Sequence, residues 1–312
     1  MKKAHLKVHS SAARKDGFRL FLMIIPFLVY IFMFSYVPLY GWRYAFYKYQ
    51  PGLPLEACQY VGWKYFTWLF SDPFYRSELI RVMKNTLGMA GINLLTSWLP
   101  MIFAVLLAEI TANKFKRVVQ TLTTIPNFIS WILVYAMAYC MFSPGSGFVN
   151  RLLLQLGWIE ESIDFLADPN HVWLKMWAWG TWKGLGWSAI TYLAAIAGID
   201  KQLYEAAVVD GANRLQRIWH VTLPGLIPTF FVLFVISIGN ILSSGVEQYM
   251  VFENAFVHPD IEVLDLYVFN MGMGSGQYSY TTAIGAMKTI VAVVLMCSAN
   301  WLSKIIRGSS VF

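Results

Sequence analysis

Charged residues are scarce in this 312-residue chain. Asp, Glu, Lys and Arg make up 13% of it and hydrophobic residues 57%, and the mean hydropathy is +0.52. An ordinary soluble domain carries about 25% charged residues, so a soluble globule of this size could not cover its surface with so few. The composition therefore excludes a soluble enzyme, and the high hydrophobicity excludes a disordered chain.

Cysteines are few, and the signatures of common enzymes are missing. The three cysteines lie far apart without a CxxC pair, which excludes a disulfide framework and a cysteine-based zinc site. There is no GxxxxGKS/T loop for ATP, no HExxH and no GxSxG, and the five histidines are scattered. We therefore expect no catalytic residue, no metal and no cofactor bound by this chain.

Six apolar runs are long enough to cross a bilayer, since a spanning helix needs about 18 or more consecutive apolar residues. Two of them contain lysine: Lys175 and Lys183 lie in the fourth, and Lys288 lies in the sixth. These features predict an all-α membrane protein with six transmembrane helices. The runs are 20–42, 85–108, 118–150, 173–199, 218–246 and 279–303.

The basic residues favour one orientation. Most Lys and Arg lie in segments that share one side of the membrane, and most acidic residues lie on the other, so the net charge of +7 reflects topology rather than nucleic-acid binding. We expect a multi-pass protein of the cytoplasmic (inner or plasma) membrane with both termini cytoplasmic. Residues 1–17 form its tail and residues 18–312 one membrane domain. The basic segments are 1–19, 109–117, 200–217 and 304–307.

The outer segments are then 43–84, 144–172 and 247–278. Within the first, residues 72–84 have the apolar spacing of a short amphipathic surface helix. The last holds five acidic residues. Two interpretations of it stay open: it docks an extracytoplasmic partner, or it is a solvated loop.

One inner segment, 200–225, has the pattern of a helix–turn–helix. Asp200 is a suitable N-cap for a helix from Lys201, and Gly211 can end that helix with a positive φ. A second short helix is expected over 213–219, and Pro224 then restarts the chain into the fifth span.

This segment resembles the EAA loop of ABC-importer permeases, and its extended form is similar to the sugar permeases related to maltose permeases. More narrowly, it looks like the LplB-type polysaccharide permeases, which include subunits of alginate importers. The motif reads Glu205-Ala206-Ala207, Gly211 and Val221-Thr222-Leu223-Pro224, with Asp210, Ala212 and Ile218; Lys84-Asn85-Thr86-Leu87 and Gly147-Phe148-Val149-Asn150 also fit that subgroup.

The resemblance implies a type I importer permease fold in which this loop is a coupling helix docked on a cytoplasmic ATPase dimer. ATP and Mg would be bound by that ATPase, and Glu205 would face a basic residue there. It also implies a second homologous permease, an extracytoplasmic solute-binding protein and an oligosaccharide substrate, moved by alternating access. The coupling residues are Glu205, Ala206, Ala207, Asp210, Gly211, Ala212, Ile218, Leu223 and Pro224.

Maltose-type relatives line their substrate site from the helices flanking the EAA loop. Sugars present apolar ring faces that stack on aromatic rings and hydroxyls that need polar partners. Glycines open room for a ring, or else only allow close helix packing. The positions implied by offset from Glu205 are Gly180, Gly184, Trp187, Asn240, Ile241 and Ser244, with Asn127, Trp131 and Tyr135 as looser candidates.

Lys183 and Lys288 are charges inside predicted spans. Such groups usually face a cavity, pair with an acid or reach toward the interface. Because no acid lies in the same spans, we expect a partner from the other permease or from the substrate. The hypothesis is an electropositive pathway for an acidic oligosaccharide, such as one derived from alginate or pectin. Lys288 alternatively extends toward the surface, or joins a salt bridge between subunits.

Other classes of membrane protein fit less well. An ABC permease for peptides or amino acids is the alternative within the family, and the extended motif speaks against it. An ion-coupled secondary transporter would show intramembrane acids or broken repeats. A membrane-embedded transferase would need clustered acids or histidines near one face. Neither pattern is evident in the sequence.

Overall fold

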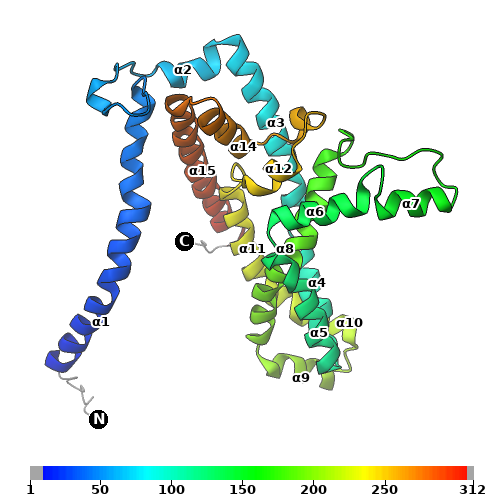
Figure 1. The fold of residues 1–312 in the computed structure, drawn as a ribbon. Coiled ribbons are helices and arrows are strands. Elements are labelled where there is room, and N and C mark those ends of the chain that lie inside the picture. The colour runs from blue at the N-terminus through cyan, green and yellow to red at the C-terminus, as the bar shows by residue number, and fades with distance from the viewer. Residues whose placement is uncertain (1–9, 308–312) are drawn as a thin grey trace. The chain divides into compact units, whose positions relative to one another are not determined.

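The computed structural model describes residues 10–307, which are helical apart from loops and one isolated antiparallel bridge between Tyr47 and Tyr60 (Figure 1). The chain forms two compact units. One comprises the residues up to Thr67 together with Gln277–Ala286, and the other comprises Trp68–Gly276 and the residues from Met287 onward. The all-helical prediction is confirmed. The first part of the expected tail, 1–9, lies outside the described residues.

The first unit contains the first predicted span. Helix α1 (Ser10–Ile31) continues through a π-helical turn (Phe32–Tyr36) into a 3-10 helix (Val37–Phe46). Residues Gly17–Phe46 form an apolar span of 30 residues. No residue in its most apolar stretch is buried. Unburied apolar side chains along a whole helix are typical of contact with lipid or another chain, which agrees with the prediction for 20–42.

In the second unit, α2 (Lys64–Ser71), which begins in the first, leads to α3 (Pro73–Leu95) and α4 (Leu99–Ala108). The Asp72 carboxylate caps α3 by accepting from the backbone N–H of Phe74 (2.9 Å) and Tyr75 (3.3 Å). Together, α3 and α4 form one apolar span, Pro73–Ala108. The separate surface helix expected over 72–84 is therefore wrong, because α3 continues without a break past Lys84 and through Gly88 and Gly91 to Leu95.

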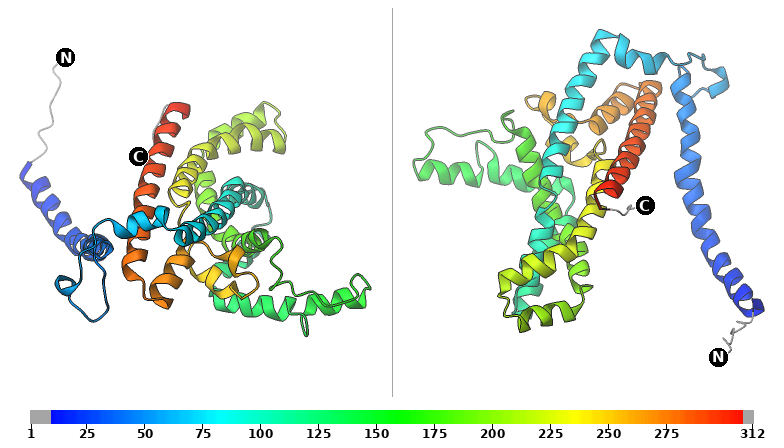
Figure 2. Two further views of the ribbon diagram at one scale, coloured as in Figure 1. Left: turned by 90° about the horizontal axis from the view of Figure 1, so that it is seen from above. Right: turned by 180° about the vertical axis from the view of Figure 1, so that it is seen from behind.

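The third predicted span, 118–150, is wrong as one continuous helix. Helix α5 (Asn113–Thr124) ends in a 3-10 turn (Ile125–Phe128), and α6 (Trp131–Phe142) leaves at 105° to it. Pro126 removes a backbone donor, and Ser130 caps the new helix through the N–H of Leu133 at 3.4 Å. Helix α7 (Phe148–Gln155) then projects sideways from this unit (Figures 1 and 2).

Helix α8 (Val172–Ala197) packs against α3, α4, α5 and α11. It approaches α5 closely at Gly186, where an added Cβ would lie 2.2 Å from the carbonyl oxygen of Thr123. Its extent matches the predicted span 173–199. Four helices of the described residues are long and apolar enough to cross a membrane, or five if the bent pair of α5 and α6 forms one span. The sequence predicted six. Helix α8 is long enough, but its tryptophans, lysines and glycines make it less apolar.

Helices α9 (Lys201–Val209) and α10 (Arg214–Arg217) form the predicted helix–turn–helix. A π-helical turn (Ile218–Thr222) joins α10 to α11 (Leu223–Gly239), so that Arg214–Gly239 is one continuous helix. The restart expected at Pro224 is therefore wrong, because the π-helical turn joins α10 to α11 without a break. The fifth span also ends at Gly239 rather than 246. Helices α9 and α10 lie at the opposite end of this unit from α14 (Figures 1 and 2).

Segment 247–278 is not a solvated loop, so that interpretation of its acidic residues is wrong. Docking of an extracytoplasmic partner stays a prediction. It holds α12 (Glu247–Phe252), α13 (His258–Ile261), α14 (Leu264–Phe269) and a π-helical turn (Asn270–Gly274). Apolar side chains from each of these helices, including Tyr249, Ile261 and Leu266, are buried in one core. Helix α15 (Tyr278–Arg307) then forms the last span, as predicted over 279–303.

Candidate functional site

The turn between α9 and α10 is built by backbone hydrogen bonds. Gly211 has φ +79°, and its N–H donates to the carbonyl of Val208 while the N–H of Ala212 donates to that of Ala207. This is the Schellman arrangement, in which a left-handed glycine satisfies the last carbonyls of a helix. At the other end of α9, Asp200 caps the N–H of Gln202 at 3.0 Å. Both predicted boundaries of the helix are confirmed.

The second helix begins with a capping box. The Asn213 side chain accepts from the N–H of Gln216 at 2.9 Å, and the Gln216 side chain accepts from the N–H of Asn213 at 2.7 Å. The Tyr204 hydroxyl lies 3.0 Å from that of Thr222, which fastens α9 to the turn before α11. Local bonds thus fix the shape of this segment with few long-range contacts.

The outward side of α9 and α10 is apolar and exposed. Val209 is 87% exposed, and the side chains of Val208, Leu215 and Trp219 are also exposed. Beside them is a depression of about 320 Å³. Exposed apolar side chains around a shallow hollow are typical of a protein–protein docking surface. The hollow is lined by Ala207, Asp210, Gly211, Ala212, Gln216 and His220.

The predicted coupling residues divide into two groups. Glu205, Ala206 and Pro224 are exposed. Ile218 and Leu223 instead pack against a buried core that includes Ala104 and Leu226. The motif therefore supplies both an exposed face and its attachment to the spans.

The predicted pathway residues Lys183, Asn127 and Trp131 come together at the break between α5 and α6. Lys183 Nζ donates to the backbone carbonyls of Asn127 at 2.7 Å and Pro126 at 3.3 Å, and it lies 5.4 Å from the centroid of the Trp131 ring. The carbonyls at the end of a helical turn carry partial negative charge and lack partners. Lys183 satisfies the carbonyl of Asn127 and shares that of Pro126 with the N–H of Ile129, which explains how this half-buried charge is accommodated.

Further candidates lie along the same helix, α8. An added Cβ at Gly184 would meet open space, and one at Gly180 would meet the Gln248 side chain at 3.5 Å. Trp187 is half exposed, packs edge-on against Phe128 with 5.6 Å between ring centroids, and lines a groove of about 380 Å³. The groove also holds the polar side chains of Asn93, Ser97, Ser188, Thr191 and Ser237, which the sequence prediction missed.

The candidates after the coupling loop are placed differently from the prediction. Asn240 is the C-cap that follows α11, and Ile241 and Ser244 lie in the non-helical stretch after it. Tyr135 packs in the apolar core against Phe252, with ring centroids 5.2 Å apart. These four residues stay predictions for the pathway.

Lys288 has a partner within its own chain. Its ammonium group pairs with the carboxylate of Asp265, whose other oxygen accepts from the N–H of Gly245 at 3.0 Å. The expectation that this partner comes from another subunit or the substrate is wrong, because α14 brings an acid from outside the spans to α15. By contrast, none of the ion pairs of the described residues involves Lys183.

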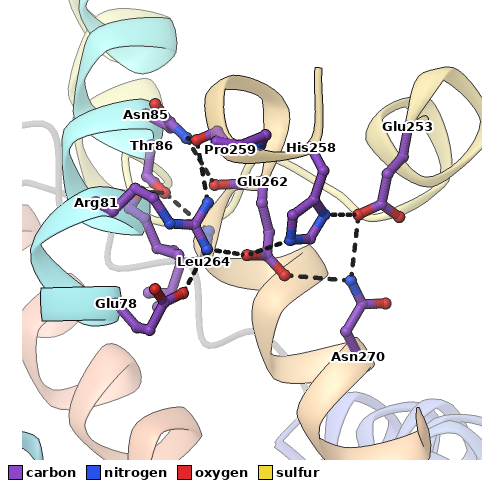
Figure 3. Close-up of polar contacts among 11 residues, drawn as sticks. Glu78, Arg81, Asn85, Thr86, Glu253, His258, Pro259, Glu262, Leu264 and Asn270 are labelled. Atoms are coloured by element: carbon purple, nitrogen blue, oxygen red, sulfur yellow. Dashed lines mark hydrogen bonds and ion pairs between the residues drawn. The ribbon is translucent and has the colours of Figure 1, made fainter. Parts of the chain in front are cut away.

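Polar side chains of α3, from Glu78 to Thr86, form a polar clamp on segment 253–264 (Figure 3). The buried Asn85 amide donates to the carbonyls of Pro259 at 2.8 Å and Glu262 at 3.1 Å, and the Thr86 hydroxyl accepts from the N–H of Leu264 at 2.8 Å. Arg81 forms 2.6 Å ion pairs with both Glu78 and Glu262. The sequence pattern alone did not indicate this role, although polar residues within an apolar helix were a signal for it.

Comparisons with known proteins define the class. A family model described as a binding-protein-dependent transport system inner membrane component matches residues 96–308. Protein LplB of Bacillus subtilis is 37% identical over 94% of this chain and 91% of its own length. The polygalacturonan/rhamnogalacturonan transport system permease protein YteP of the same organism is 39% identical over 91% of this chain and 87% of its own length.

Solved structures agree with these matches. A bacterial ABC transporter involved in the import of the acidic polysaccharide alginate contains a chain that is 32% identical, with a TM-score of 0.81 over 94% of this chain and 97% of that one. The same type of transporter in complex with an alginate pentasaccharide-bound periplasmic protein gives a TM-score of 0.82 at 31% identity, covering 97% of this chain and 100% of that one.

The chain therefore belongs to the family of binding-protein-dependent transport system inner membrane components. It is a permease subunit of an ABC importer, a translocation component of the inner membrane rather than an enzyme. The predicted family and importer fold are confirmed, whereas the roles of individual site residues stay predictions.

Proposed function

We propose that this permease imports acidic oligosaccharides, of the kind released from polymers of uronic acids. Two comparisons support this substrate class: one relative is named for polygalacturonan transport, and the solved neighbours import alginate. Both are acidic polymers. A peptide or amino-acid substrate has no such support.

The observation that carries the proposal is the environment of Lys183. Its ammonium group is half-buried at a break in the helices, beside an aromatic ring and next to the open space at Gly184. Lys175 and Lys288 are neutralised by Asp168 and Asp265, but Lys183 has only carbonyl acceptors among the described residues. Without a carboxylate partner, its ammonium group can pair with a uronate carboxylate, while Trp131 offers a face for a sugar ring.

The exposed face of α9 and α10 serves as the coupling surface for a cytoplasmic ATPase. Its exposed apolar side chains and shallow hollow fit a protein partner, and Glu205 on the exposed side offers a carboxylate to a basic residue. ATP and Mg are bound by that ATPase. Its closure moves the spans between inward-open and outward-open states.

The assembly contains further proteins. A second homologous permease completes the pathway, an ATPase dimer drives it, and an extracytoplasmic solute-binding protein delivers the oligosaccharide. Segment 247–278 takes part in docking that binding protein. Residues 18–312 form one lipid-embedded domain, and both termini are cytoplasmic.

The test is stimulation of ATP hydrolysis by the purified importer in proteoliposomes, with acidic and neutral oligosaccharides of equal length. We expect stimulation by the acidic ligand in the wild type and in Lys183→Arg. Lys183→Gln should lose at least about tenfold in apparent affinity, as expected when a charged group loses its counter-charge. The control is Lys175→Gln, whose lysine pairs with Asp168.

Two results contradict the proposal. One is equal stimulation by neutral and acidic sugars in the wild type. The other is an unchanged response of Lys183→Gln to the acidic ligand, with basal ATP hydrolysis intact.

A further inference from the structure

Three potential metal ligands converge in segment 253–262. Glu253 directly follows α12, His258 begins α13 and Glu262 directly follows it, and Figure 3 shows their side chains pointing toward one another. One ligand atom from each lies within 4.8 Å of the others. Glu262 is buried, and Glu253 and His258 are half-buried. Nothing in the transport mechanism above uses this group.

The donor atoms are of mixed type. His258 Nδ1 lies 2.5 Å from Glu253 Oε1, and its Nε2 lies 3.6 Å from Glu262 Oε2. The Asn270 amide lies between the same two carboxylates, 3.5 Å from Glu253 Oε1 and 3.2 Å from Glu262 Oε1. An amide can turn its oxygen toward a cation instead. The histidine sets this group apart from an ordinary acidic cluster.

The charges around the group do not balance. Glu78 and Glu262 share one guanidinium, that of Arg81, while Glu253 pairs only with His258, an imidazole that adds a positive charge only when it is protonated. Arg81 engages Glu262 through Oε2, which leaves Oε1 on the side of Asn270. Excess negative charge in a partly buried place is unfavourable unless a cation offsets it.

We propose that Glu253, His258 and Glu262 bind a divalent transition-metal ion of the zinc type, with Asn270 beside the fourth position. Zinc binds imidazole nitrogen and carboxylate oxygen in four-coordinate sites, whereas Mg²⁺ and Ca²⁺ take oxygen ligands. The ion ties the end of α12 and both ends of α13 to the turn after α14. It thereby rigidifies the segment that the polar clamp holds against α3.

The test measures Zn²⁺ in the purified importer complex, prepared without a polyhistidine tag. The complex is stripped with chelator, equilibrated with Zn²⁺ and desalted, and the bound metal is counted by mass spectrometry. We expect one zinc per permease chain and a rise in its unfolding temperature on adding Zn²⁺ but not Mg²⁺. His258→Gln and Glu253→Gln should each weaken zinc binding by about tenfold or more.

The matched control is Asp260→Asn, which removes an exposed carboxylate from the same short helix. It should bind zinc like the wild type. The proposal is overturned if the folded wild type, judged by its thermal unfolding, retains no zinc. It is also overturned if His258→Gln and Glu253→Gln retain as much zinc as Asp260→Asn.

Discussion

Two connecting segments of the second unit are stabilised in opposite ways. The α9–α10 segment, 200–217, is held by backbone caps and leaves apolar side chains exposed. The segment 253–270 buries its apolar side chains and is held by side-chain ion pairs and hydrogen bonds to α3. The difference indicates that the first is shaped to meet another protein, whereas the apolar side chains of the second are anchored in this protein's own core.

The largest expected effect comes from breaking the buried ion pair of the second segment. Glu262→Ala removes the buried partner of Arg81, which keeps only the more exposed Glu78, and should cost about 2–3 kcal/mol of stability. Thermal unfolding in detergent, with chelator present to exclude any metal contribution, measures this loss. In the first segment, Glu109→Ala removes the more exposed pair with Arg214, 3.2 Å long. This should cost less than about 1 kcal/mol. Equal losses would remove the distinction between the segments.

A smaller effect is expected from the turn of the coupling segment. Gly211 has φ +79°, so Gly211→Val forces a branched side chain into the left-handed region at a cost of about 1–2 kcal/mol. Gly211→Asn is the matched control, since asparagine tolerates this conformation. We expect the valine variant to purify with less bound ATPase than the asparagine variant. If both keep the ATPase fully, the shape of this turn does not matter for docking.

The smallest effect on stability is expected at the exposed face itself. Glu205 is exposed, so Glu205→Lys should shift stability by less than about 0.5 kcal/mol. It reverses the charge offered to the partner, however, and should release the ATPase during co-purification from membranes. An importer that keeps its ATPase in this variant would contradict the proposed role of Glu205, whatever the thermal data show.

Local signals made the coupling segment predictable. Asp200, Gly211 and Asn213 act through hydrogen bonds to residues two to five positions away, so the sequence contains the whole interaction. The predicted restart at Pro224 was wrong because a π-helical turn connects α10 to α11 as one continuous helix. Hydropathy alone could not show that outcome.

Segment 253–270 was not predictable for the converse reason. Its acids left docking of a partner and a solvated loop equally open, but Arg81 and Asn85 reach it from more than 170 positions earlier in the chain. The same holds for Lys288, whose partner Asp265 comes from another helix. An ion pair of this kind depends on packing, and a one-dimensional charge pattern does not contain it.

The sequence by itself determined that this is a helical membrane protein with an importer coupling loop, because hydropathy, helix caps and motif spacing act over short stretches of chain. The tertiary structure decided where the third apolar run breaks, which lysine stays without a carboxylate and how the acids of the outer segment are used. Those outcomes depend on the free energy of burying charges, which is set by whichever groups the fold brings alongside them.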